Sequence, residues 1–198
     1  MARKRIARKA VGIVIAGAVV AGGLAITSMA AWSEPQSTEP DSSAFFELQH
    51  SVSGDNWVGN RATPSTAVVA IDIGGIPAGA TAYGYVSVRT SPESVGGSVL
   101  MTASEHAAGD PLYDALRYGA GFVPSAADCS ASGMSVADLV PFGSGMSGGA
   151  GEGFVVEAAA ASARVICIAL TVPEGSDPAL ESLTTRLEWQ FVGTAAQE

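Results

Sequence analysis

From residue 45 onward, apolar and polar residues alternate in short runs that indicate β-strands. In residues 46–52 each apolar or aromatic residue is followed by a polar one, and this period of two is typical of a half-buried strand. The run at 164–172 is apolar on both faces, as in a central strand. Further strands are predicted at 66–73, 80–90, 98–103, 154–157 and 185–192. Short strands separated by turns predict an all-β fold, an antiparallel β-sandwich or jelly roll.

One or two short helices are expected to interrupt these strands. Asp110 and Pro111 fit the N-cap and the first helical position, and Gly119 fits the residue that follows a helix. A second helical turn is predicted at 177–183, where an Asp-Pro pair again starts the segment. The alanine-rich stretch 157–164 has helical propensity but lies between two strand-like runs, so we expect a tight connection there.

Residues 1–31 have the pattern of a secretory signal peptide. Five basic residues lie within positions 3–9, and residues 10–26 are an uninterrupted run of apolar residues and glycines, expected to be helical. Small residues follow at the positions that a signal peptidase reads: Ser28, Ala30 and Ala31. An uncleaved membrane helix is the alternative, because this run is at the short limit of a bilayer span. We expect cleavage near Ala31, followed by a polar linker at 32–44 and a β-sandwich domain at 45–198.

The charge of the chain narrows the classes of partner. Charged residues make up 15% of the 198 residues, against roughly 25% in an average soluble protein. Half of the 10 basic residues lie in positions 3–9, so the remainder carries 5 basic and 19 acidic residues, a net charge of 5 − 19 = −14. Such an acidic surface repels nucleic acids and anionic lipids. We therefore expect no nucleic-acid partner, and contact with a membrane only through the N-terminal segment.

Cys129 and Cys167 are the only cysteines of the chain. In an exported protein an even pair of cysteines indicates a disulfide. We expect this disulfide to attach the glycine-rich stretch 142–153 to the central strand that contains Cys167. A two-cysteine metal site is the alternative, although no histidine lies at ligand spacing from either cysteine.

No motif in the chain indicates catalysis or cofactor binding. Residues 143–148 match G-x-G-x-x-G by letter, but Pro141 precedes them and more glycines follow, so we expect a flexible loop instead of a dinucleotide site. His50 and His106 are the only histidines, and the zinc-peptidase pattern H-E-x-x-H is absent. We interpret His50 as a core residue. The sequence therefore predicts no catalytic residue, no metal site and no cofactor.

The signal region resembles that of exported proteins processed by the dedicated peptidase SipW, a family that includes the biofilm matrix protein TasA and the camelysins. The matching positions comprise glycines, a threonine, small residues, an aromatic residue and an acid: Gly22, Gly23, Thr27, Ala30, Ala31, Trp32 and Glu34. The arrangement of the two cysteines is similar to that of an alternate-signal branch of this family in Gram-positive bacteria with GC-rich genomes.

The resemblance extends into the predicted strands. Residues 54–57 (Gly-Asp-Asn-Trp) end a strand similar to the first mature strand of the family, and Leu-x-Trp-x-Phe at 187–191 is similar to its terminal strand. Residues 76–80 occupy the place of a turn that in the family reads Leu/Ile-x-Pro-Gly-Asp. This chain departs from that turn at Ala78 and at Ala80, which stands in place of the acid.

The resemblance implies an exported, TasA/camelysin-like structural or matrix protein, extracellular or on the cell surface, with the signal peptidase and further copies of itself as partners. The second hypothesis is a secreted carbohydrate- or protein-binding module, for which Tyr83 and Tyr85 on one face of a strand provide exposed aromatic groups. The third is a secreted hydrolase. Camelysins have been linked to casein degradation, but this sequence offers no residues to carry such an activity.

Overall fold

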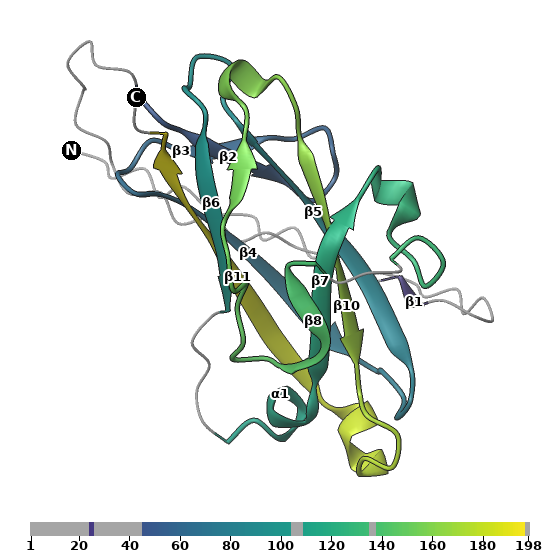
Figure 1. Ribbon diagram of the computed structural model, residues 1–198. Coiled ribbons are helices and arrows are strands. Elements are labelled where there is room, and N and C mark those ends of the chain that lie inside the picture. Colours follow the sequence, from purple (N-terminus) through teal and green to yellow (C-terminus); the bar gives the residue numbers. More distant parts are fainter. Residues whose placement is uncertain (1–23, 26–44, 104–108, 135–137, 197–198) are drawn as a thin grey trace, which may run out of the picture.

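The structure is a computed structural model that describes residues 24–25, 45–103, 109–134 and 138–196, and it contains two antiparallel β-sheets packed face to face (Figure 1). The first sheet has the strand order β3 (Val58–Asn60), β2 (Leu48–Ser51), β5 (Thr81–Thr90), β10 (Arg164–Thr171), β7 (Arg117–Val123), β8 (Val140–Gly145). The second sheet has the order β4 (Ser65–Gly74), β11 (Thr184–Ala195), β6 (Gly97–Ala103), β9 (Phe154–Val156). The predicted all-β sandwich is confirmed.

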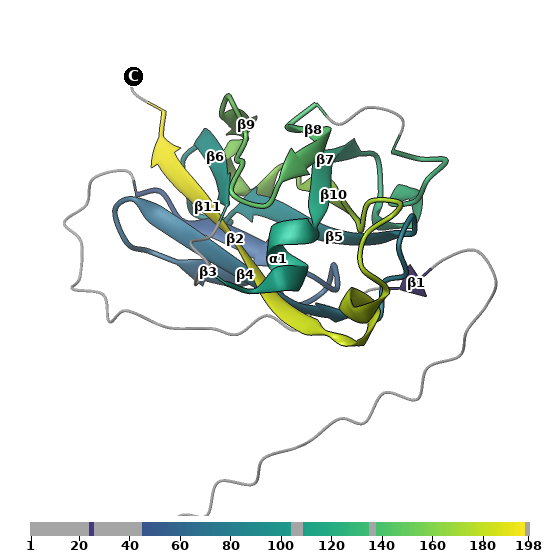
Figure 2. The ribbon, with the colours of Figure 1, turned by 90° about the horizontal axis from the view of Figure 1, so that it is seen from below.

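The predicted helices are confirmed as short elements. α1 (Pro111–Ala115) begins at Asp110, whose carboxylate accepts hydrogen bonds from the two backbone N–H groups at 112 and 113, and it lies at the end of the sandwich that faces the viewer in Figure 2. Three 3₁₀ turns accompany it: η1 (Ala126–Asp128), η2 (Ala158–Ala160) and η3 (Pro178–Ser182). The prediction that Gly119 follows the helix is wrong, because the backbone is already extended at Leu116 and Gly119 lies within β7.

The core lies between the two sheets and is formed by the inward-facing residues of each strand. In β11 the alternation expected from the sequence is confirmed, since Leu187, Trp189 and Phe191 are fully buried. Each such side chain contributes roughly 1.5–3 kcal/mol to the free energy of unfolding. β5 alternates in the same way. Val86 and Val88 are buried in the core, and Tyr83 and Tyr85 lie on the opposite face.

A disulfide joins Cys129 to Cys167 on the outer face of the first sheet. It attaches the loop between β7 and β8 to β10, and this loop covers a second, small apolar cluster made by Val123, Met134, Cys167 and Ala169. The pairing of the cysteines is confirmed, and a disulfide is typical of a protein in an oxidising compartment. The stretch attached by the disulfide differs from the prediction, because residues 140–145 are placed by pairing with β7.

Within the sandwich domain, three strands of the described residues were not predicted: β3, β7 and β8. β7 and β8 are rich in glycine, and β8 contains Pro141, features that weaken a strand pattern. Residues 143–145 therefore belong to an edge strand, and the expectation of a flexible loop is wrong there.

Within the N-terminal segment only Leu24 and Ala25 are described. They form β1, which pairs in parallel with Ala82 and Tyr83 of β5 (Figure 1), although they fall in the run expected to be helical. β2 pairs with β5 only at residues 87–90. The same edge of β5 is therefore not paired with β2 at residues 81–86, and β1 pairs with it there. The cleavage region at 28–31 and the linker at 32–44 lie outside the described residues. No helix in the described part of the chain is long and apolar enough to cross a membrane.

Candidate functional site: the leading segment

Residues 45–51, which we call the leading segment, contact both sheets where the chain enters the sandwich. Their last part is β2, which pairs with β5 on one side and with β3 on the other. Ahead of β2, the carbonyl of Phe45 accepts a hydrogen bond from Val95 N at 3.1 Å, and the carbonyl of Glu47 accepts one from Ser91 N at 3.0 Å. The connection between β5 and β6 therefore binds the backbone of this segment.

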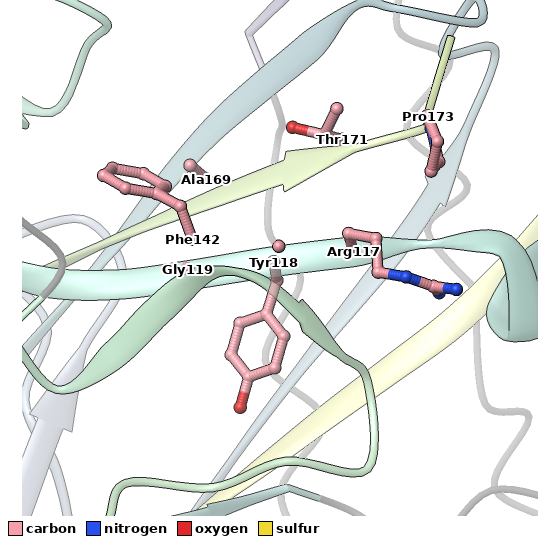
Figure 3. Close-up of a pocket in the computed structure, with 8 residues that line it drawn as sticks. Arg117, Tyr118, Gly119, Phe142, Ala169, Thr171 and Pro173 are labelled. Atoms are coloured by element: carbon pink, nitrogen blue, oxygen red, sulfur yellow. The ribbon is translucent and has the colours of Figure 1, made fainter. Parts of the chain in front are cut away.

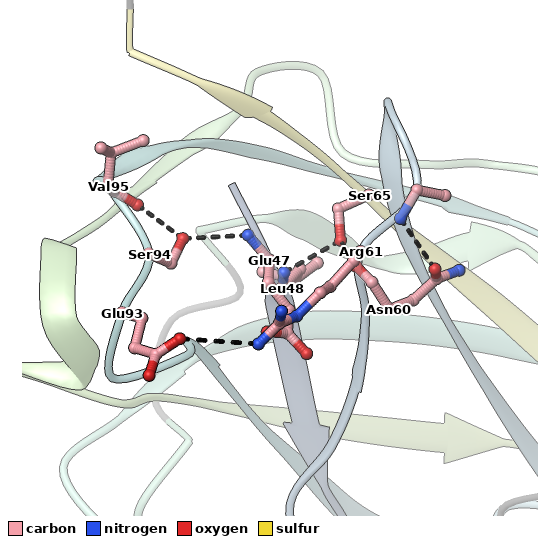
Figure 4. Close-up of polar contacts among 9 residues, drawn as sticks. Glu47, Leu48, Asn60, Arg61, Ser65, Glu93, Ser94 and Val95 are labelled. Atoms are coloured by element: carbon pink, nitrogen blue, oxygen red, sulfur yellow. Dashed lines mark hydrogen bonds and ion pairs between the residues drawn. The ribbon is translucent and has the colours of Figure 1, made fainter. Parts of the chain in front are cut away.

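Two buried serine hydroxyls also bind this backbone, one from the β5–β6 connection and one from the start of β4 (Figure 4). Ser94 Oγ accepts a hydrogen bond from Glu47 N at 2.9 Å, and Ser65 Oγ accepts one from Leu48 N at 2.9 Å. Both serines are at most 3% exposed. Their hydroxyls donate in turn to the carbonyls of Val95 and Asn60. Since these contacts reach only main-chain atoms, they recognise an extended strand whatever its side chains are.

Phe46 adds a side-chain contact to this backbone recognition. Its ring lies over Gly97 of β6 and Gly193 of β11, at the end of the second sheet. A Cβ atom at Gly97 would be 2.5 Å from a ring carbon of Phe46, and one at Gly193 would be 2.4 Å away. No real Cβ atom is found so close to another carbon, so the two glycines form a slot that only the absence of side chains keeps open.

The charged groups near the leading segment are two exposed side chains, Arg61 and Glu93, and the mostly buried Glu47. Arg61 Nε lies 3.2 Å from Glu47 Oε2, and Arg61 Nη2 lies 3.7 Å from Glu93 Oε2. The Arg61 guanidinium carbon also lies 4.7 Å from the centre of the Phe45 ring. The Arg61 side chain is 50% exposed, and such pairs typically contribute about 0–1 kcal/mol. These contacts orient the segment, whereas the buried serines and the glycine slot hold it.

The aromatic residues proposed for a binding module are partly buried. Tyr83 and Tyr85 share the outer face of the first sheet, as predicted, and both are partly buried. Tyr83 packs against the cluster that contains the disulfide. Further along this face, the Arg89 guanidinium carbon lies 3.8 Å from the centre of the Trp57 ring, and Arg89 Nε donates to the side-chain oxygen of Gln49.

A shallow pocket of about 280 Å³ lies on the same outer face, over β7, β8 and β10 (Figure 3). Phe142, which is 52% exposed, forms one wall, and Gly119 leaves room for its ring. Arg117 is the only charged residue of the lining, and its Nη1 donates to three backbone carbonyls at the end of α1. The rest of the lining is largely apolar.

The predicted site residues can now be placed. His50 is 2% exposed, which confirms its interpretation as a core residue, and His106 lies outside the described residues. Over the described part of the chain, no three His, Cys, Asp or Glu side chains are grouped so that they could hold a metal ion.

The residues that bind the leading segment were not predicted from the sequence: Ser65, Ser94, Gly97 and Gly193. The signal available for Gly193 was its position inside a strongly alternating strand, where glycine often marks the close approach of another group.

Comparison of the chain with protein-family models, with curated proteins and with solved structures finds no match.

Proposed function

We propose that this protein is an exported structural protein of the cell surface or extracellular matrix, and that its copies assemble by exchanging the leading segment. The observation that carries this proposal is the way the segment is bound, by main-chain hydrogen bonds to Ser65, Ser94 and the β5–β6 connection and by one ring in a glycine slot. The same contacts serve a segment from a second copy equally well, which is the condition for strand exchange.

Export is supported by two features of the chain. Residues 1–31 have the pattern of a signal peptide, and Cys129 and Cys167 form a disulfide. The resemblance to TasA and the camelysins points to the same location, with the signal peptidase as a partner during export. No residue is proposed as catalytic, and no nucleic acid or cofactor is proposed as a ligand.

The geometry of exchange favours open assemblies. A copy that receives a segment through Ser65 and Ser94 donates its own segment through a different surface, so the contact is head-to-tail. Such a contact need not close into a ring, and repetition then gives a filament. The contacts inside one copy and between copies are the same, so the balance depends on protein concentration and on repulsion between chains of net charge −14. Salt screens such repulsion between exposed charges, and we expect it to promote assembly.

Locking the leading segment to its own sheet tests this proposal. Ser51 and Ser87 are directly opposite in the antiparallel pair β2–β5, where Cα atoms are about 4.5–5.5 Å apart, a separation suited to a disulfide. We expect the oxidised variant Ser51→Cys/Ser87→Cys to remain monomeric in sedimentation and light scattering, while the matched variant Ser51→Ala/Ser87→Ala assembles like the wild type. Filaments of the locked variant, seen by electron microscopy, would refute strand exchange.

The lock is a sharper test than removal of residues 33–52. We expect a protein without these residues to lose assembly, but Leu48 is a fully buried core residue, and its removal also lowers stability by about 2–5 kcal/mol. The lock retains every core side chain.

The alternative function is a secreted carbohydrate- or protein-binding module. The observation that favours it is the exposed ring of Phe142 beside the pocket on the first sheet. Saturable binding of a glycan or protein that disappears in Phe142→Ala, with the locked variant still binding, would support this function in place of assembly.

A further inference from the structure

A histidine lies near the end of the leading segment, on the face directed into the sandwich. His50 is 2% exposed, and its Nδ1 atom is buried without a hydrogen-bond partner. Its cross-strand neighbours are Val88 in β5 and Val58 in β3, and Leu48 is the next inward-facing residue of β2 itself. A buried imidazole in such apolar surroundings is stable only in its neutral form.

The charged groups around His50 do not compensate a positive charge on it. On β2 and its extension, Glu47 alternates to the outer face and pairs with Arg61. On β5, Arg89 lies on the outer face over Trp57. The inward residues of β4, which packs across from β2, carry no charge: Ser65, Ala67, Val69, Ile71 and Ile73. β3 carries no ionisable residue, and Asp55, in the turn that precedes it, is exposed.

We infer that His50 acts as an acid-sensitive release for the leading segment, so that protonation of its imidazole expels β2 from its own sheet and makes the segment available for exchange. This inference rests on the proposed function for its biological meaning, because it describes the regulation of the same site. The release itself is a property of a single copy and can be measured without any assembly.

The direction of the effect follows from the two states of the segment. Burial lowers the pKa of His50 in the docked segment, and a hydrogen bond with the backbone of Val58 partly opposes this change. A released segment exposes the imidazole to water, where its pKa is about 6.5. Docking is therefore fully stable above about pH 6.5 and loses stability as the pH falls through the lower pKa of the docked state.

Release of the segment alone is expected before the rest of the domain unfolds. β2 has four residues and lies near the edge of the first sheet, whereas β5 and β10 pair along eight positions in its centre. Segments with few pairing partners open locally at lower free energy than central strands. A charge placed on β2 therefore affects the element that is easiest to detach.

Hydrogen exchange followed by mass spectrometry tests this release in the full exported protein. Exchange protection of peptides covering residues 45–51 is measured at about pH 7.5 and about pH 5.5, on either side of the ordinary histidine pKa, and corrected for intrinsic exchange rates. We expect protection to fall several-fold at the lower pH in the wild type, with about tenfold as the upper limit, because a released imidazole of pKa about 6.5 is only about ten to one protonated at pH 5.5. His50→Met, which fills the site without a titrating group, should change by less than about twofold.

The chain provides a matched control, because His106→Met removes its only other histidine and should respond to pH like the wild type. Equal loss of protection in His50→Met and in the wild type would overturn the inference, and so would unchanged protection in the wild type. If His50→Met does not fold, the imidazole of the wild-type protein is titrated by NMR instead. The reference is the pKa of the histidine in a short unstructured peptide with the sequence around His106. A His50 pKa at or above this reference value would refute the inference.

Assembly assays on the same variants separate this inference from the proposed function. Acid also neutralises carboxylates and reduces the net charge of −14, so it favours association in every variant. Release without filaments would support the acid-sensitive release and refute assembly by exchange. Filaments that form at the same pH in His50→Met and the wild type, with no change in protection, would refute the release and leave the proposed function intact.

Discussion

Loss of the Cys129–Cys167 disulfide should strongly destabilise the domain, and the structure allows the magnitude to be worked out. The bond closes a loop with a sequence separation of 38. In the chain-entropy relation, closing this loop lowers the entropy of the unfolded chain by about 13 cal/mol/K. This raises the free energy of unfolding by about 4 kcal/mol at 25 °C. The expected change is large because the closed loop is long, and the loss of loop-closure entropy grows with the number of residues enclosed.

Urea denaturation of the oxidised protein, the reduced protein and the variant Cys129→Ala/Cys167→Ala measures this effect. At about 2 kcal/mol/M, a loss of about 4 kcal/mol lowers the midpoint by about 2 M, and the melting temperature by about 8–16 °C. Alanine is the appropriate replacement because Cys167 is fully buried, where a serine hydroxyl would lack a partner. The double variant should not respond to reductant. A loss below about 1 kcal/mol in both reduced and substituted protein would refute the loop-closure reasoning.

Two further substitutions test local features of the fold. Gly193→Ala should lower the free energy of unfolding by about 1–3 kcal/mol in the same urea denaturation assay, because its Cβ would collide with Phe46. Gly151→Ala is the control and should be neutral, because its Cβ meets nothing within 4 Å. Equal effects of the two substitutions would contradict the glycine slot. Ala160→Gly should raise the melting temperature, since Ala160 has φ 54° and a left-handed L-residue costs about 1–2 kcal/mol. Ala161→Gly, at φ −61°, should lower it, and a decrease in both would refute this argument.

The strands that face the core could be predicted from the sequence because their side chains alternate between two environments. β11 places Leu187, Trp189 and Phe191 inward and polar residues outward, so its period of two is visible in the sequence itself. The Asp-Pro pairs before α1 and η3 were visible for a similar reason, since capping is a contact between residues close in sequence.

β7 and β8 could not be predicted, because their stability comes from the neighbouring strand and not from their own pattern. Gly119 and Gly121 of β7 lie opposite Ala169 and Cys167 of β10, and small residues there make room for the disulfide loop and for the Phe142 ring. Such a requirement appears only when strands are placed side by side in register.

The binding site of the leading segment could not be predicted either, because it too is formed by residues that are distant in the sequence. Ser65 and Ser94 lie 29 positions apart in the sequence, and each is an ordinary serine near the end of a strand. Only the packing of the two sheets brings both hydroxyls to the backbone at Glu47 and Leu48. By contrast, the burial of His50 could be predicted, because it occupies an inward position of an alternating strand.

The place of β11 in the second sheet has a consequence for the order in which the domain forms. β11 pairs with β4 over ten positions and with β6 over seven, and it alone joins these two strands. Until Thr184–Ala195 are available, β4 has no partner in its sheet and the core around Trp189 is absent. A chain emerging from the ribosome at about 5–20 residues per second therefore completes the second sheet only after Thr184–Ala195 have been synthesised.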